Sequence, residues 1–244
     1  MTQETVVLSR PDGHTMQASL FLPEASRYPA PAVVVVFDVF GTTPDLNRIA
    51  GRFVQQGYGV LIPDLFDRPE PKLLCVLRAL RSVARGTGRE FDDIEVGRKY
   101  LATRSEVDSG KIAIAGFCMG GGFAILLAAS GTFKVSAPFY GDVPKDIAAL
   151  RGACPTIASY GERDRASLIN AGQRLKRSLE QLDVPHDIKF YPDAGHGFMN
   201  RNTGFIAEKI LPNLPVHAGY HHVSSEDAWQ RLFSFFDKHL NSSE

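Results

Sequence analysis

The chain has 244 residues, of which 44% are hydrophobic, and its 27 lysine and arginine residues balance its 27 aspartate and glutamate residues. This length and apolar content suit one globular domain over residues 1–244, and the zero net charge argues against nucleic acid or an anionic membrane surface as a partner. There is no apolar run of membrane-spanning length, and the first residues lack the pattern of a signal peptide. The three cysteines lack a paired spacing. Together these features predict a cytoplasmic protein with reduced thiols.

The N-terminal half of the chain predicts an opening hairpin followed by alternating strands and helices. Residues 5–9 and 17–22 flank a Pro-Asp-Gly turn, and the β-branched run over 32–37 is typical of a strand covered on both faces. Helical spacing of apolar residues predicts helices over 45–56 and 89–104, with a strand over 58–62 between them.

The C-terminal half continues the alternation. Predicted strands cover residues 111–115, 135–140, 156–160 and 186–191, and predicted helices cover 121–129, 167–182 and 226–240. This order predicts an α/β fold with a mostly parallel central sheet and helices on both faces. Residues 69–88 and 203–225 look less regular, and we expect both to pass over the top of the sheet, where functional loops gather.

The segment Gly116-Phe117-Cys118-Met119-Gly120 joins a predicted strand to a predicted apolar helix. This layout is that of a nucleophile elbow, in which a strained corner presents its central residue at a helix N-terminus. About half a positive elementary charge at that position favours the thiolate of Cys118. A free cysteine is often only a small buried hydrophobe, and glycine-rich corners also bind phosphates, but neither nucleotide-binding spacing of glycines is present. The pattern favours Cys118 as a nucleophile.

A nucleophilic thiol needs a base and a group that orients the base, and both are expected at later strand ends. His196 lies between two glycines after the predicted strand over 186–191, and Asp164 follows the strand over 156–160. We expect His196 to be the base and Asp164 the orienting acid, with Glu162 and Asp193 as less favoured substitutes. The oxyanion hole is expected from the backbone N–H groups of Met119 and Val39.

These residues together resemble the dienelactone hydrolase family, a branch of the α/β-hydrolases with a cysteine nucleophile. The resemblance covers most of the chain, and its motifs are Phe37 to Gly41, Pro63 to Phe66, the elbow, Phe139-Tyr140-Gly141, Gly161 to Asp164, and Gly195-His196-Gly197-Phe198. It implies the α/β-hydrolase fold, a Cys118–His196–Asp164 triad, and hydrolysis of a lactone or ester through an acyl-enzyme, without a cofactor. Family members of this type open dienelactones to maleylacetate during the breakdown of chloroaromatics.

The sequence departs from the family pattern in two places. Asp38 stands where the family has a glutamate that holds the resting thiol, so Asp38 is a candidate thiol-gating group, with a solvated loop acid as the alternative. The family binds a substrate carboxylate with arginines, but here Asn200 occupies the later arginine position and Arg201 follows it.

Other basic and aromatic residues are candidate substrate contacts. Arg78 and Arg81 fall on one helical face of the earlier irregular segment, and guanidinium groups pair well with carboxylates. With Arg201 they predict an acidic lactone or ester as substrate, although a basic helical face is often only solvated. We also expect Tyr140, in one of the shared motifs, to contact substrate.

Several other possibilities remain open at this point. The near alternative is a general carboxylesterase or thioesterase, and a non-catalytic small-molecule binding protein is a different class. A redox sensor is disfavoured because no resolving cysteine lies near Cys118, and Cys75 and Cys154 are expected to be inert. No metal site is expected at the histidines of residues 217–222, because Pro215 and Gly219 disrupt the helix that would align them. We expect a monomer or a small homo-oligomer.

Overall fold

The computed structural model describes residues 2–164 and 168–240. It contains an eight-stranded sheet with the strand order β1-β2-β4-β3-β5-β6-β7-β8. The strands are β1 (Thr2–Ser9), β2 (Thr15–Leu22), β3 (Ala30–Val36), β4 (Gly59–Pro63), β5 (Val107–Phe117), β6 (Ser136–Phe139), β7 (Thr156–Gly161) and β8 (His186–Tyr191). β1 and β2 form the antiparallel edge, and β4 through β8 pair in parallel, which confirms the mostly parallel sheet.

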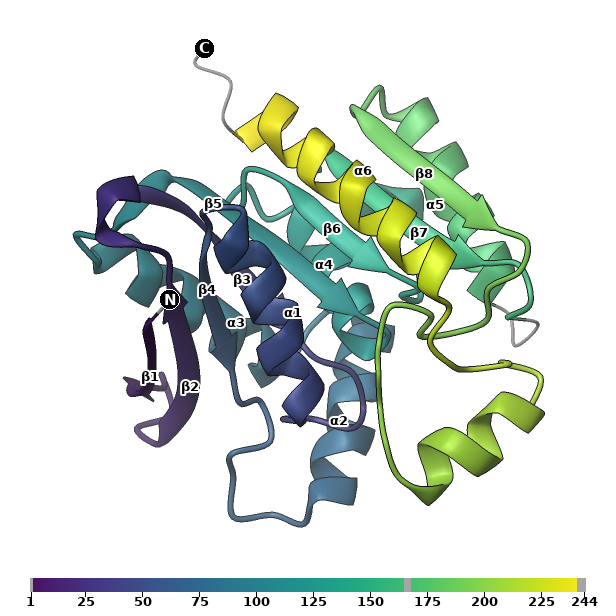
Figure 1. Ribbon diagram of the computed structural model, residues 1–244, viewed down its shortest axis with the longest axis horizontal. Coiled ribbons are helices and arrows are strands. Elements are labelled where there is room, and N and C mark those ends of the chain that lie inside the picture. Colours follow the sequence, from purple (N-terminus) through teal and green to yellow (C-terminus); the bar gives the residue numbers. More distant parts are fainter. Residues whose placement is uncertain (1, 165–167, 241–244) are drawn as a thin grey trace.

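Helices cover both faces of this sheet. They are α1 (Pro44–Gln55), α2 (Lys72–Arg85), α3 (Arg89–Thr103), α4 (Met119–Ala128), α5 (Leu168–Gln181) and α6 (His222–Leu240). In Figure 1, α1 and α6 cross the near face, whereas α3, α4 and α5 lie behind the sheet. Strands between two helical layers must be apolar on both sides, and the valines of residues 33–36 in β3 are fully buried.

The core between the sheet and the near helices is aromatic. The indole of Trp229 on α6 packs edge-on against Phe53 of α1, with ring centroids 5.2 Å apart, and also contacts Phe117 and Phe139 of the sheet. Such pairs bury large apolar areas and add specific ring geometry. They hold α1 and α6 against the strands that lead to the site.

Two segments differ from the sequence-based expectation. Residues 69–88 were expected to be irregular, and this is wrong because Lys72–Arg85 forms α2. Leu73, Leu77 and Leu80 have the spacing of one helical face, but this face is exposed rather than buried. The helix also begins after Pro71 without a capping side chain.

The segment between β8 and α6 also contains more structure than expected. Ile206–Ile210 is a π-helical turn and Leu211–Asn213 a 3₁₀ turn, and α6 begins at His222, four residues before the predicted start. The predicted helix over 167–182 corresponds to α5, and Ser167 lies outside the described residues.

The carboxyl ends of β3, β5, β7 and β8 meet at one edge of the sheet, because β3, β5, β6, β7 and β8 run parallel in that order. The segment between β8 and α6 projects beyond this edge in Figure 1. No helix in the described part of the chain is both long and apolar enough to cross a membrane.

Candidate active site

Cys118 occupies the corner between β5 and α4. Its backbone dihedrals are φ 55° and ψ −114°, a conformation that costs energy for any residue with a Cβ atom. The Cys118 N–H donates to the carbonyl oxygen of Phe139 at 3.0 Å, which ties the corner to β6. The side chain is partly exposed at the first turn of α4, as a nucleophile elbow requires.

The glycines around Cys118 are required by close backbone approach. A Cβ atom on Gly116 would lie 2.0 Å from the carbonyl oxygen of Gly120, and one on Gly120 would lie 2.1 Å from that of Val36. Neither contact leaves room for a side chain. The sequence pattern therefore has a direct steric cause.

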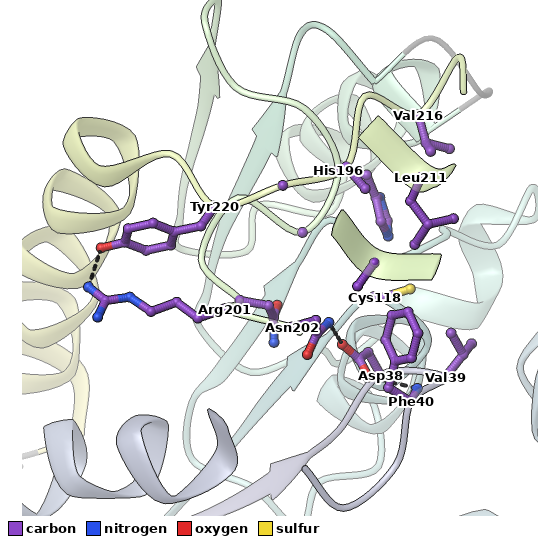
Figure 2. Close-up of a pocket in the computed structure, with 15 residues that line it drawn as sticks. Asp38, Val39, Phe40, Cys118, His196, Arg201, Asn202, Leu211, Val216 and Tyr220 are labelled. Carbon is purple, nitrogen blue, oxygen red and sulfur yellow. Dashed lines mark hydrogen bonds between the residues drawn. The ribbon is translucent and has the colours of Figure 1, made fainter. Parts of the chain in front are cut away.

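His196 and Asp164 lie in the loops that follow β8 and β7. The Nδ1 atom of His196 and the Oδ2 atom of Asp164 are 2.7 Å apart, and the Asp164 residue is 2% exposed. Figure 2 shows the imidazole of His196 directed toward Cys118. Glu162 and Asp193 are exposed, so the structure brings Asp164 to the histidine rather than either substitute.

The segment before α6 holds the backbone of His196. The His196 N–H donates to the carbonyl oxygen of Val216 at 2.9 Å, and the Gly219 N–H donates to the carbonyl oxygen of His196 at 3.1 Å. A Cβ atom on Gly195 would lie 1.8 Å from the carbonyl oxygen of His217. Gly195 is therefore required by the approach of this distant segment.

The pKa of His196 is set by opposing effects. Burial by itself lowers it, but the negative charge of the Cys118 sulfur, together with hydrogen bonding to Asp164 and Cys118, raises it from 6.5 to about 10. The imidazolium form of His196 is therefore favoured near neutral pH.

Two backbone N–H groups, those of Met119 and Val39, belong to the segments next to the thiol. Met119 is the first residue of α4, where the backbone N–H has no partner within the helix. Val39 lies in a turn closed by the bond from the Gly41 N–H to the Asp38 carbonyl oxygen, at 3.1 Å. Over the described residues, neither the Met119 nor the Val39 N–H donates a hydrogen bond. Their role as oxyanion donors stays a prediction.

Asp38 lies beside this turn and is 7% exposed, so the alternative of a solvated loop acid is wrong. Its carboxylate accepts hydrogen bonds from the Phe40 N–H at 2.8 Å and from the Asn202 side-chain amide at 2.7 Å. Burial raises the pKa of Asp38 although both bonds lower it. Within the described part of the chain no hydrogen bond joins Asp38 to Cys118, so the gating role stays a prediction.

A cavity of about 220 Å³ opens over Cys118 and His196. Its other lining residues are Asp38, Val39, Phe40, Gly197, Asn200, Arg201, Asn202, Ala207, Leu211, Val216, Ala218, Gly219 and Tyr220. The cavity is smaller than the roughly 300–1,000 Å³ of pockets for drug-sized ligands, which indicates a small substrate.

The structure does not bring three of the expected substrate contacts to this cavity. Arg78 forms ion pairs with Glu70 at 3.2 Å and Glu90 at 3.1 Å, and Arg81 is exposed on α2. Neither arginine lines the cavity. Both lie on α2, and the partners of Arg78 are Glu70, which precedes α2, and Glu90 on α3.

Tyr140 is buried beneath the site instead of lining the cavity. Its hydroxyl donates to the Oδ1 atom of Asn200, and its ring packs edge-on against the imidazole of His196 with centroids 5.2 Å apart. Burial raises the pKa of Tyr140 well above its usual value, so the phenol stays neutral. Tyr140 therefore packs against the imidazole of His196 and helps to hold it in place.

A pair of residues on α1 holds the loop after His196, and sequence reasoning did not find it. Arg48 forms a 2.5 Å ion pair with Asp45 and donates to the Met199 carbonyl oxygen at 2.7 Å. The Arg201 N–H in turn donates to Asp45 at 2.8 Å. The spacing of Asp45 and Arg48 predicts only a surface ion pair on a helix, so no local signal pointed to this contact.

The remaining cysteines and histidines form no second site. Cys75 is buried, and burial raises the pKa of Cys154 to about 12. Among residues 2–164 and 168–240 no cluster of three or more His, Cys, Asp or Glu side chains is arranged to hold a metal ion.

Comparison with known proteins gives one consistent result. The model of the dienelactone hydrolase family matches residues 16–240. The chain is 29% identical to a carboxymethylenebutenolidase of Rhodococcus opacus, over 85% of this chain and 81% of the relative. It is 26% identical to a carboxymethylenebutenolidase of Pseudomonas putida, over 85% of this chain and 91% of that relative.

Solved structures agree at the level of the fold. A dienelactone hydrolase from Anabaena variabilis superposes with a TM-score of 0.69 at 17% identity, covering 98% of both chains. A dienelactone hydrolase-like promiscuous phosphotriesterase from metagenomic libraries superposes with a TM-score of 0.76 at 18% identity, covering 98% of this chain and 99% of that one. These are α/β-hydrolase architectures, as the sequence predicted.

Proposed function

This chain belongs to the dienelactone hydrolase family and is a hydrolase of the ester or lactone type, and from that premise we propose that Cys118, His196 and Asp164 are its catalytic triad. The substrate is a small carboxylic ester or lactone, and the reaction passes through a thioester of Cys118. The observation that carries the proposal is the position of His196, which bonds Asp164 at 2.7 Å on one side and faces Cys118 on the other.

The proposed reaction begins with the ion pair of Cys118 and His196. The anionic sulfur attacks the substrate carbonyl carbon, and the carbonyl oxygen becomes an oxyanion. The imidazolium of His196 then protonates the leaving alkoxide, which departs as the alcohol and leaves the acyl group on sulfur. The neutral imidazole next takes a proton from water, and the resulting hydroxide attacks the thioester to release the acid. Throughout the reaction, Asp164 accepts a hydrogen bond from the Nδ1–H group of His196.

The tetrahedral oxyanion needs donors at the start of α4. The proposal places it between the N–H groups of Met119 and Val39, which have no acceptor among the described residues. Donors of this kind contribute a factor of about 10² to 10³ each to turnover. Their fixed backbone positions mean that no reorganisation is needed when charge develops.

Replacement of the nucleophile tests the proposal. We expect Cys118→Ala to lower the hydrolysis of p-nitrophenyl acetate by at least about 10³-fold, because the covalent step is lost. The far-ultraviolet circular dichroism should be unchanged, since alanine fits the corner at least as well as cysteine. Full activity in a folded Cys118→Ala protein would refute the triad.

Alkylation of the thiol separates an enzyme from a binding protein on the same fold. In the wild type, iodoacetamide should label Cys118 rapidly and abolish hydrolysis in proportion to labelling. The His196→Ala variant should be labelled more slowly, because the imidazolium that stabilises the anionic sulfur is absent. Equal labelling rates in the two proteins would argue that His196 does not activate the thiol.

The family reaction acts on lactones that carry a carboxylate, and its relatives are named carboxymethylenebutenolidases. The expectation of an acidic substrate depended on Arg78, Arg81 and Arg201. Because the first two lie outside the cavity, the proposal is limited to a small ester or lactone and does not extend to dienelactone itself.

A further inference from the structure

We propose that the cavity selects a neutral, mostly hydrocarbon acyl group and rejects an acyl group that ends in a carboxylate. This inference rests on the proposed function, because it concerns the substrate of the same site. It departs from the acidic substrate that the arginines of the sequence suggested.

The wall opposite the elbow is hydrocarbon. Leu211, Val216 and Ala218 come from the segment before α6, and Val39 and Phe40 come from the turn after β3. Figure 2 shows Leu211 and Val216 on one side of His196 and Phe40 beside the sulfur of Cys118. A surface of this kind is favourable for methylene and methyl groups and offers no replacement for the water around a charge.

Arg201 lines the cavity but its guanidinium is directed away from Cys118, and Lys72 and Arg48 are engaged elsewhere. The guanidinium of Arg201 donates to the hydroxyl of Tyr220 at 2.9 Å and lies 4.4 Å from the centre of that ring, directed away from Cys118 in Figure 2. Lys72 donates to the carbonyl oxygen of Phe40 at 2.5 Å and does not line the cavity. Arg48 is bound to Asp45 and the backbone of the loop after His196, as described above, and does not line it either.

Beyond Arg201 and His196, two polar side chains that line the cavity, Asp38 and Asn202, are unsuited to an anion. Asp38 is itself a carboxyl group, and the side-chain amide nitrogen of Asn202 is committed to it at 2.7 Å. The Oδ1 atom of Asn202 is buried and has no hydrogen-bond partner among the described residues, so the free group there is an acceptor. A substrate carboxylate would meet acceptors and a carboxyl group where it needs donors.

The positive charge of His196 does not change this conclusion. The imidazole lies between Asp164 and Cys118, so both of its ring nitrogens are already engaged within the site. A substrate carboxylate placed in the cavity would compete with Cys118 for the same ring. In the proposed reaction, that competition would disturb the pairing of the nucleophile with its base.

A pair of esters that differ in one group tests the proposal. p-Nitrophenyl butyrate and p-nitrophenyl hemisuccinate have acyl chains of the same length, and the terminal methyl of the first is a carboxylate in the second. We expect kcat/KM for the butyrate to exceed that for the hemisuccinate by about 100-fold or more, because a desolvated and unpaired carboxylate is costly. Equal rates, or a faster hemisuccinate, would overturn the inference.

A binding measurement separates this inference from the proposed function. Methyl propyl ketone and levulinate are a matched neutral and anionic pair that cannot be hydrolysed. The neutral ketone should slow iodoacetamide alkylation of Cys118 at concentrations where levulinate has no effect, measured by peptide mass spectrometry. This result is expected even if neither ester is cleaved, in which case the proposed function fails alone. Protection by levulinate at equal or lower concentration would overturn the inference alone.

A matched pair of variants locates the selectivity in the cavity wall. Leu211 lines the cavity, whereas Leu214 on the same segment is 44% exposed and does not line it. We expect Leu211→Arg to raise the ratio of hemisuccinate to butyrate kcat/KM by about tenfold or more, because it supplies the missing cation. Leu214→Arg should leave the ratio unchanged. An equal rise in both variants would mean that long-range charge, and not the wall, decides selectivity.

An Arg201→Gln variant tests the proposal without requiring that the arginine introduced in Leu211→Arg adopt a suitable position. If the guanidinium is committed to Tyr220, this change should not lower the hemisuccinate rate more than the butyrate rate. A selective loss of hemisuccinate turnover would show that Arg201 serves a substrate carboxylate, against the proposal.

Discussion

His196 lies between two groups that both favour its charged form. Asp164 bonds Nδ1 and Cys118 lies on the other side, and their interactions with the imidazolium outweigh burial and raise the pKa of His196 to about 10. In the proposed reaction the imidazolium is the acid that protonates the leaving group. The alkaline limit of activity should therefore report this pKa.

Replacement of Asp164 should move that limit to lower pH. Asp164 raises the pKa of His196, so in Asp164→Asn the pKa falls and the imidazolium is lost at a lower pH. We expect the alkaline limb of kcat/KM to shift from near pH 10 toward neutral pH, with a rate loss of up to about 10⁴-fold at the optimum. The measurement is the pH profile of p-nitrophenyl acetate hydrolysis.

The matched control for this change is Asp193→Asn, an exposed acid in the loop of His196. Its profile should coincide with that of the wild type, because solvent screens the exposed charge. If the alkaline limb of the Asp164→Asn profile lay at the same pH as in the wild type, Asp164 would not set the charge state of His196.

At the scale of elements, the elbow depends on how closely β5 and the start of α4 approach. Gly116→Ala would place a Cβ atom 2.0 Å from the carbonyl oxygen of Gly120. We expect the change to lower the free energy of unfolding by more than about 2 kcal/mol, since backbone rather than a flexible side chain must move. Urea denaturation followed by circular dichroism measures this loss.

Gly51→Ala in α1 is the contrasting substitution. A Cβ atom there meets no heavy atom within 4 Å, and the residue lies inside a regular helix. Alanine should raise the free energy of unfolding by about 0.5 to 1 kcal/mol, through its higher helix propensity. If Gly116→Ala were as stable as Gly51→Ala, the close approach at the elbow would be disproved.

The elements also show where local patterns are informative. The strand and helix around Cys118 were predicted from small residues at both ends of the corner, and the structure gives these a steric cause in the backbone of Gly120 and of Val36. The helix α2 was missed although Leu73, Leu77 and Leu80 have helical spacing, and in the structure these leucines face solvent instead of the core. In the sequence, a leucine that will be exposed cannot be distinguished from one that will be buried. Only the packing of the folded chain distinguishes them.

At the scale of the whole molecule, a buried charge cluster joins the N-terminal hairpin to α3. Asp93 is 1% exposed and pairs with Arg10 at 2.9 Å and Arg68 at 3.1 Å. Burial raises the pKa of Asp93, while both arginines act to lower it. The cluster ties segments far apart in the chain, so its loss should affect global stability.

Asp93→Ala should lower the free energy of unfolding by about 3 to 5 kcal/mol, because it leaves buried guanidinium groups without a counterion. Glu180→Ala, which breaks an exposed pair with Lys176 at 3.9 Å, should cost less than about 0.5 kcal/mol. Urea midpoints of the two variants provide the comparison. Similar small losses in both would indicate that water reaches Arg10 and Arg68 and compensates them.

The sequence by itself determined the fold class and the placement of Cys118, Asp164 and His196. Strand and helix periodicities are local, and parallel strands bring their carboxyl ends to one edge, so residues that follow those strands must meet there. The sequence favoured Asp164 over Glu162 and Asp193, and the structure adds the physical difference, because Asp164 is buried and the other two loop acids are exposed.

Only the tertiary structure decided which groups face the substrate. Arg78 is held by Glu70 and Glu90, and Arg201 is turned toward Tyr220, so neither candidate carboxylate ligand is directed at the space above the thiol. These contacts join residues separated by a helix or a loop, and no repeat or spacing in the sequence predicts them. The direction of a long charged side chain is set by its nearest partner in space, and that partner is known only after the chain has folded.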